Sequence, residues 1–131
     1  MASPKLQAHL ERLHQSNRKP EAARNRVLHA YTFGAKRRKL VFDLQVEKFE
    51  ELILQNCHYC NAQPSNTMND GGYGFKYNGI DRLNSAEGYT ESNCVACCDT
   101  CNYMKGTLSK EEFLARISMI FKKFNGVLGN D

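Results

Sequence analysis

Four cysteines arranged as two Cys-x-x-Cys pairs are the residues of this chain best suited to chemistry. The first pair is Cys57 and Cys60, and the second is Cys98 and Cys101. Each pair can present two thiolates to one tetrahedral ion at about 2.3 Å, which is the ligand geometry of structural zinc. A site closed by four thiolates leaves no open coordination position, so we predict a zinc ion that supports the fold and takes no part in a reaction.

The six cysteines offer a second way to close such a site, because Cys94 and Cys97 also have the two-residue spacing. We favour Cys98 and Cys101, since the other two lie in a strand-like segment and resemble small buried apolar residues. Free thiols without a metal remain an alternative. Residues 1–15 are amphipathic and charged and lack the apolar centre of a secretory signal, which predicts a reducing intracellular location and no secretion.

Basic residues are concentrated near the N-terminus. Residues 1–42 contain ten Lys or Arg against Glu11 and Glu21, whereas the remainder is slightly acidic. This asymmetry predicts a polyanionic partner, nucleic acid before membrane, and no apolar run approaches the roughly 20 residues of a membrane span. An ordinary solvated helix face would carry the same charges. The candidates for phosphate contacts in this region are Arg24, Lys36, Arg37, Arg38 and Lys39.

The elements that must position these residues begin with an N-terminal arm, residues 1–42, in a chain whose 131 residues suit one domain. Ser3 followed by Pro4 predicts a helix start. Pro20 opens a second helical stretch, which Gly34 interrupts or ends.

The central region is predicted to carry the cysteine pairs on a small hairpin. An amphipathic helix formed by Val46, Phe49, Leu52 and Ile53 leads the chain to the first pair. Residues 62–74 are rich in turn formers and are expected to be a surface loop. Residues 75–80 and 93–96 can form the two strands of the hairpin, and a short helix follows from about Cys98.

The last helix is the clearest element in the sequence. Ser109 and Glu112 form a capping box, and Gly126 is a suitable C-terminal stop. The predicted organisation is therefore a basic helical arm (1–42), a zinc-stapled domain ending in this helix (43–126) and a tail (127–131). One face of the helix is apolar and is formed by Phe113, Ile117, Ile120, Phe121 and Phe124.

The segment from Asn93 to Lys105 resembles the second half of zinc-containing HNH (His-Me finger) endonucleases of phage and mobile-element type. It contains Asn, four residues, Cys-x-x-Cys-Asn and then x-x-Lys. The first cysteine pair and the dipeptide Asp81-Arg82 also occupy the family's positions, and the resemblance covers roughly residues 35–125. It implies an α+β fold: a small ββα-metal finger with a four-cysteine zinc site, flanked by helices at both ends.

The resemblance also implies roles for individual residues. Asp81 and Asn102 would hold a catalytic Mg²⁺ or Mn²⁺ ion, which prefers carboxylate and amide oxygens. Asn93 would brace the loop between the strands, and Lys105 would contact DNA phosphate.

One residue departs from the family's pattern. Arg82 stands where the family has the histidine that acts as general base, and a guanidinium stays protonated and cannot take that role. Arg82 could instead bind the scissile phosphate or stabilise the transition state. Three routes for the proton of the attacking water stay open: His58, attack by hydroxide without a protein base, and transfer to the substrate phosphate.

Three functions follow from these features. The first is a metal-dependent DNA endonuclease that hydrolyses phosphodiester bonds in duplex or branched DNA, with RNA a less favoured substrate. The second is a catalytically inactive zinc-dependent module that binds nucleic acid through the same surface. The third is a zinc-ribbon scaffold for protein contacts, and the resemblance further suggests a phage, viral or mobile-element origin.

Ordinary structural roles compete with each site assignment. Asp81 could cap a turn, and Asn102 could cap the short helix or bond within the zinc knuckle. Arg82 could pair with Asp99 or Glu87 on the surface. Three tyrosines could stack on bases or pack in the core, and these are Tyr73, Tyr77 and Tyr89.

Overall fold

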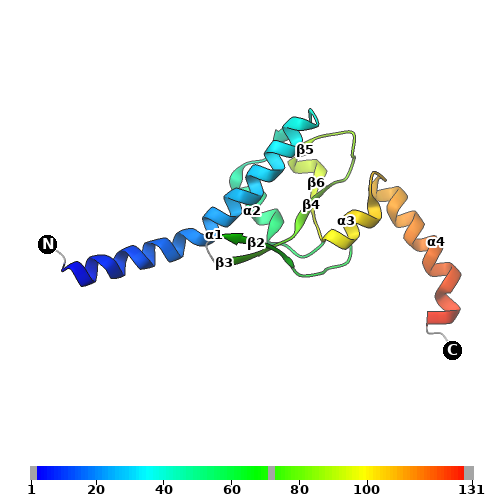
Figure 1. Cartoon of the computed structure of the whole chain (residues 1–131). Helices are drawn as coiled ribbons and strands as arrows, with labels where there is room; N and C mark the ends of the chain where they lie inside the picture. The colour runs from blue at the N-terminus through cyan, green and yellow to red at the C-terminus, as the bar shows by residue number, and fades with distance from the viewer. Residues whose placement is uncertain (1–2, 71–72, 129–131) are drawn as a thin grey trace.

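The computed structural model describes residues 3–70 and 73–128, and Figure 1 shows a central body of short strands and small helices with a long helix at each end of the chain. No helix in this described part of the chain is long and apolar enough to cross a membrane. The elements are, in order, α1 (Pro4–Arg37), β1 (Phe42–Asp43), α2 (Val46–Ile53), β2 (Asn66–Asp70), β3 (Tyr73–Tyr77), β4 (Gly79–Arg82), β5 (Tyr89–Thr90), the 3₁₀ turn η1 (Glu91–Asn93), β6 (Cys94–Cys97), α3 (Asp99–Lys105) and α4 (Lys110–Leu128). The predicted α+β class is confirmed.

Helix α1 is continuous, so the expected division into two helical stretches is wrong. Pro20 and Gly34 both lie inside it. The start is where we predicted it, because the Ser3 hydroxyl accepts a hydrogen bond from the Leu6 amide at 3.2 Å. A proline inside a helix costs about 3 kcal/mol. The helix nevertheless continues, since the turns after Pro20 are held by packing against the rest of the protein.

The main core lies where α1 packs on α2 and on the strands. Tyr31 of α1 meets Phe49 of α2 and Tyr89 of β5 edge to face, with ring centroids 5.8 and 5.7 Å apart. The second half of the basic N-terminal segment therefore contributes to the core around which the cysteine-bearing region folds. The fully buried apolar residues of α1 and α2 are Ala23, Val27, Ala35, Phe49, Leu52 and Ile53.

Strands β2 and β3 form an antiparallel hairpin, so the surface loop expected over residues 62–74 is wrong. Met68 pairs with Phe75 and both side chains pack on the main core. Thr67 pairs with Lys76 on the other face, where the lysine Nζ donates to the threonine hydroxyl at 2.7 Å. The prediction failed because β2, NTMND, contains a single large apolar residue and so has no readable alternation.

The one predicted hairpin exists as the second hairpin of the chain, and it carries the site. β4 pairs antiparallel with β6, with Asp81 opposite Val95 and Arg82 opposite Cys94. Its first strand covers residues 79–82, slightly later than expected, and α3 follows directly after β6 as predicted. The order strand, strand, helix is that of the ββα unit implied by the resemblance.

Gly79 at the start of β4 allows α1 to approach the hairpin. A Cβ atom there would lie 2.8 Å from the Tyr31 hydroxyl oxygen, which accepts a hydrogen bond from the Ile80 amide at 2.9 Å. We predict that Gly79→Ala lowers the free energy of unfolding by about 1–3 kcal/mol, because the ring must move and the hydrogen bond is strained. Urea unfolding followed by circular dichroism would measure the change. Gly74→Ala is the control, since its added Cβ would meet only side-chain atoms at 3.5 and 3.8 Å. Equal stability of the two variants would contradict the prediction.

Helix α4 begins with the predicted capping box. The Ser109 amide donates to the Glu112 carboxylate, and the Glu112 amide donates to the Ser109 hydroxyl, both at 3.1 Å. The expected stop at Gly126 is wrong, because the helix continues to Leu128. Only the start of its apolar face is covered: Phe113 is buried and meets the Tyr59 ring edge to face, with centroids 5.3 Å apart.

Candidate active site and metal centre

The four predicted zinc ligands converge at one point. Their sulfur atoms all lie within 4.8 Å of one another, and those of Cys60 and Cys98 are 3.6 Å apart. Sulfurs bound tetrahedrally to zinc at about 2.3 Å are separated by about 3.8 Å, so the thiolate set fits this ion in both chemistry and spacing. The prediction that these residues can hold one metal ion is confirmed.

Local backbone structure presents each pair. The first pair lies in a turn after α2, which the Cys57 amide helps to close by donating to the Ala62 carbonyl at 2.8 Å. The second pair begins α3, where the Cys98 sulfur caps the helix by accepting from the Cys101 amide at 3.4 Å. Ligation would therefore hold the first turn of α3, immediately before Asn102.

The thiols of this cluster differ in acidity. Burial by itself would raise the pKa of Cys57, but hydrogen bonds from the backbone amides of Cys60, Cys98 and Tyr59 outweigh it and lower the pKa to about 6. Burial raises the pKa of Cys98 and that of Cys101. The lowered pKa favours the thiolate form of Cys57, whereas a metal ion that binds here would displace protons from Cys98 and Cys101.

The competing cysteine pair lies outside this cluster. Among the described residues, the set with metal-ligand spacing includes neither Cys94 nor Cys97. Cys94 packs in the main core, and Cys97 is fully buried beside the metal cluster, where its thiol donates to the Cys98 carbonyl at 3.4 Å. Burial raises the pKa of Cys94 to about 11, so it stays protonated and packs as a small apolar residue.

A cleft of about 700 Å³ brings the three predicted catalytic residues together. Asp81 and Arg82 reach it from β4, and Asn102 reaches it from α3. The remaining lining residues come from α1 and the residue after it, β4 and the loop after it, β5, and α3 and the turn after it. They are Ala30, Tyr31, Arg38, Ile80, Ser85, Tyr89, Tyr103, Gly106 and Thr107.

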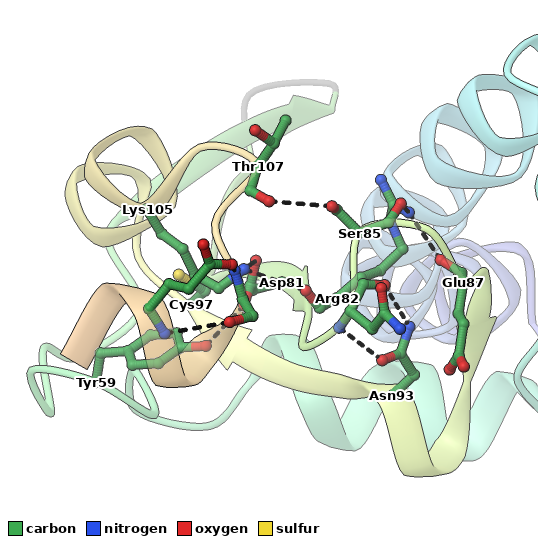
Figure 2. A network of polar contacts seen from close by, with 12 residues as sticks. Tyr59, Asp81, Arg82, Ser85, Glu87, Asn93, Cys97, Lys105 and Thr107 are labelled. Atoms are coloured by element: carbon green, nitrogen blue, oxygen red, sulfur yellow. Dashed lines mark hydrogen bonds and ion pairs between the residues drawn. The ribbon is translucent and has the colours of Figure 1, made fainter. Parts of the chain in front are cut away.

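Asp81 is the buried acid of the cleft. Its side chain is 5% exposed, and each carboxylate oxygen has a partner (Figure 2). Oδ2 accepts a hydrogen bond from the Tyr59 hydroxyl at 2.8 Å, and Oδ1 lies 3.3 Å from the Lys105 ammonium. Burial, followed by this hydrogen bond, raises the pKa of Tyr59, so the phenol stays protonated and acts as a donor.

Lys105 is buried, so it cannot make the contact with DNA phosphate that was expected of it. Its side chain is fully enclosed, and the ammonium also donates to the Arg82 carbonyl at 3.3 Å. A buried ammonium requires a charged or hydrogen-bonding partner. The lysine therefore ties the end of α3 to β4 and orients the Asp81 carboxylate.

Arg82 is held across the loop that follows β4. Its Nη1 donates to the carbonyls of Ser85 and Glu87 (Figure 2). The guanidinium also lies 5.4 Å from the centre of the Tyr89 ring. The contact with Glu87 is thus to its backbone and is not the surface ion pair that the sequence allowed. These bonds use one of the two terminal nitrogens, so the guanidinium retains further donors.

Asn93 braces the same loop from the other side. Its amide nitrogen donates to the carbonyls of Asn84 and Gly88 at 3.1 and 2.9 Å, and its oxygen accepts from the Asn84 amide at 2.9 Å. The Asn93 carbonyl also accepts from the Leu83 amide at 2.8 Å. One buried asparagine thus closes the loop that carries the partners of Arg82.

Helix α3 presents exposed residues at the mouth of the cleft. Asn102 is exposed and directly follows the ligand Cys101, and its neighbour Tyr103 is 91% exposed. Met104 is also more than half exposed. Sequence reasoning did not single out Tyr103, because a seven-residue helix has too few turns to show which face is covered.

The basic residues of α1 have unequal roles. Arg24 forms an ion pair within the protein: its Nη1 lies 3.0 Å from the Glu50 carboxylate of α2, and its side chain is 15% exposed, so its contact with DNA stays a prediction. Lys36, Arg37 and Lys39 are exposed at the end of the helix. Arg38 lines the cleft, where its Nη2 donates to the Tyr89 hydroxyl at 3.0 Å.

The other residues with a suggested role are His58, as a possible base, and three tyrosines, as possible stacking partners for nucleic-acid bases. Within the described part of the chain, no histidine lines the cleft, and His58 lies exposed with its ring edge to face with Tyr59. Partial burial of the ring lowers the pKa of His58 below its usual value. Tyr77 and Tyr89 pack with the core, and the side chain of Tyr73 lies outside the described atoms.

Asn78 supports the first cysteine pair and was not predicted. It is fully buried, and its amide nitrogen donates to the carbonyls of Gln55 and Ala62, on either side of Cys57 and Cys60, at 2.9 and 3.2 Å. Only its position between β3 and β4 brings it to this turn, so no local pattern could have revealed it.

Comparisons with known proteins agree with this architecture. No protein-family model matches the chain. It is 40% identical over 85 residues to an uncharacterised protein of Acanthamoeba polyphaga mimivirus. The matched region is 65% of this chain but only 14% of the viral protein. The solved structure of the rare-cutting HNH restriction endonuclease PacI is similar over 79% of this chain and 80% of that one, with 23% sequence identity and a TM-score of 0.57. The chain therefore has an HNH-like fold with four clustered cysteines that can hold a metal ion.

Proposed function

We propose that this protein is a metal-dependent DNA endonuclease that hydrolyses phosphodiester bonds. The proposal rests on one observation: a single cleft gathers a carboxylate, an amide and a guanidinium, from Asp81, Asn102 and Arg82, on a ββα unit. The HNH-like fold supports it, because the structural neighbour PacI is a rare-cutting HNH restriction endonuclease that perturbs DNA.

The donors in the cleft fit a hard divalent cation. A carboxylate has about four lone-pair positions, and the partners of Asp81 occupy two of them. Asn102 adds an amide oxygen from an exposed position, and this oxygen-only set suits Mg²⁺ or Mn²⁺. When bound, such an ion would supply positive charge to the phosphate and the leaving oxygen.

The residues around the ion site have positioning and electrostatic roles. Lys105 and Tyr59 fix the direction of the Asp81 carboxylate before any ligand binds. The guanidiniums of Arg82 and Arg38 both line the cleft and can bind the scissile phosphate, because the arginine fork matches phosphate oxygens. Arg82 stays protonated, so it stabilises charge and leaves the proton of the attacking water to solvent or to substrate phosphate.

DNA would approach the cleft along the C-terminal end of α1. Lys36, Arg37 and Lys39 are exposed there, while Arg38 from the same run enters the cleft. Tyr103 at the opposite wall can stack on a base or a sugar. This arrangement implies backbone contacts with little sequence preference outside the cleft.

We predict that Lys36→Ala, Arg37→Ala and Lys39→Ala, combined in one variant, weaken DNA binding and its dependence on salt. Each lost phosphate contact should reduce the slope of log K against log salt by about 0.9 for duplex DNA. Fluorescence anisotropy from about 50 to 200 mM salt would measure both effects. Lys48→Ala is the control, because that ammonium already lies 3.6 Å from the Glu51 carboxylate. An unchanged slope in the triple variant would place the DNA elsewhere.

The test of the proposed function is cleavage of supercoiled, linear and branched DNA by zinc-loaded protein with Mg²⁺ or Mn²⁺. Cleavage that requires the divalent ion and is lost on its removal would support the endonuclease. Protein that binds these DNAs but cuts none of them would refute it.

A second function is favoured by the residues at the cleft centre. Arg82 cannot act as a base, and the Lys105 ammonium reduces the pull of Asp81 on another cation. These features suit a catalytically inactive zinc-dependent module that binds nucleic acid. Arg82→His distinguishes the two functions, because a gain of cutting by this variant of an inert protein would identify a binding module built on a nuclease fold.

We also infer a viral or mobile-element origin for this chain. The mimivirus relative supports it, and the matched region is only 14% of that longer protein.

A further inference from the structure

Helix α4 carries an uncovered apolar seam. Phe113, Ile117, Ile120 and Phe124 follow one another at intervals of four, three and four residues, which places them in a single line along a helix. Only Phe113 is buried; the other three are 37%, 51% and 47% exposed. Figure 1 shows α4 extending from the central body, with no other element covering its length.

The seam is wide enough to form an interface. Leu114 and Phe121 flank it and are 45% and 57% exposed. Ile117, Ile120, Phe121 and Phe124 line an apolar groove of about 420 Å³. Five large side chains exposed by about half present on the order of 400 Å² of apolar surface, which is at the size where an exposed patch marks a contact surface. Two such surfaces with their polar margins approach the roughly 1,200 Å² of the smaller specific interfaces.

The charges along α4 indicate that the partner covering the seam is a second copy of the same helix. The helix begins with Lys110, Glu111 and Glu112, carries Arg116 near its middle and has Lys122 and Lys123 toward its other end, so its start is net acidic and its other end is basic. A second α4 running antiparallel would place acids opposite lysines at both ends of the contact, whereas a parallel one would oppose like charges. The antiparallel arrangement also sets the helix dipoles against each other favourably.

We propose that this protein forms a homodimer in which the α4 helices of two copies pair antiparallel through this seam. A crossing centred between Ile117 and Ser118 places Ile117 beside its own counterpart and Leu114 opposite Phe121 of the second copy. Such an interface is isologous and closes after two copies. Because Phe113 packs on Tyr59, the pairing would join the two clefts through a helix anchored at its first turn.

The test compares two variants of the full zinc-loaded chain by light scattering during size-exclusion chromatography. Wild type is expected to shift from the 14.9 kDa monomer to twice that mass as its concentration rises to about 100 µM. Ile117→Ser with Phe121→Ser should raise the dimer dissociation constant at least about tenfold. Met119→Ser is the matched control, since Met119 is 59% exposed on the opposite side of α4 and should leave the dimer unchanged.

Circular dichroism shows whether each variant keeps its helices, and both altered positions are exposed, so folding should be retained. A wild-type protein that stays monomeric at the highest concentration overturns the proposal. So does a dimer that persists in the Ile117 and Phe121 variant, or one that is lost equally in Met119→Ser.

Charge reversal tests the direction of pairing. Lys122→Glu with Lys123→Glu places acids at both ends of α4, and Glu111→Lys with Glu112→Gln makes the first turn basic while keeping a residue able to close the capping box. Each variant alone should dimerise several-fold more weakly than wild type, and an equimolar mixture should recover the wild-type affinity. Homodimers of both variants as strong as wild type would refute the antiparallel pairing.

Discussion

Asn102→Ala is expected to lower the rate of DNA cleavage by about 10²-fold or more, with little change in DNA affinity. The amide is one of two side-chain oxygen donors that we assign to the divalent ion, and removing a group that acts at the reacting phosphate commonly costs a factor of this size. Its side chain is exposed on α3, so truncation leaves no buried cavity. The measurement is single-turnover nicking of supercoiled DNA over a range of Mn²⁺ concentrations.

Two comparisons make this result specific. Thr100→Ala removes an exposed side chain from the same helix at a position that does not line the cleft, and it should cleave like wild type. Asp81→Asn keeps the shape of the other ligand but removes its charge, so it should be as impaired as Asn102→Ala. Full cleavage by Asn102→Ala would remove this residue from the ion site.

Removal of zinc is expected to unfold the protein. Four thiolates join the turn after α2 to the first turn of α3. Three of these ligands and Cys97 form a small buried cluster, and among the described residues the partly buried hydrophobic residues packed against it are Tyr59 and Ala62. Structural zinc contributes roughly 10–16 kcal/mol of apparent binding free energy in small zinc-binding peptides, more than a domain of this size has in net stability. The exposed position of Cys60 leaves the site open to chelators.

Metal content and thermal unfolding measured together would check this expectation. Wild type should contain one zinc ion per chain and unfold cooperatively, and Cys101→Ser should lose both properties. Cys94→Ala is the matched control, because that buried thiol is not a member of the cluster and its replacement should keep the metal. A cooperative transition in zinc-free protein would contradict the prediction.

Local patterns predicted the elements whose signals lie within a few residues. The Ser109 and Glu112 capping box, the helix start at Ser3 and the amphipathic helix α2 all rely on contacts at short sequence separation. The two cysteine pairs belong to this class as well, because two-residue spacing already orients both thiolates of a pair.

Predictions failed where distant packing overrides local preference. The turns after Pro20 remain helical because Ala23 and Val27 are buried against the rest of the protein. Strand β2 lacks alternation and forms by pairing with β3, while Met68 packs on the core. At Gly126 the local stop signal did not end the helix, which continues to Leu128.

The spacing of the cysteines was enough to predict that four of them share one metal ion, and local motifs were enough to place Asp81, Asn93 and Asn102 in a resemblance to one family. The surroundings of these residues could be seen only in the folded protein, because burial and ion pairing depend on which elements meet. It placed Lys105 against Asp81 and Arg24 against Glu50, since a charge enclosed by packing is stable only beside an opposite charge. It also left Tyr103 and the seam of α4 exposed, which no periodicity can reveal, because an apolar stripe looks the same whether another element covers it or not.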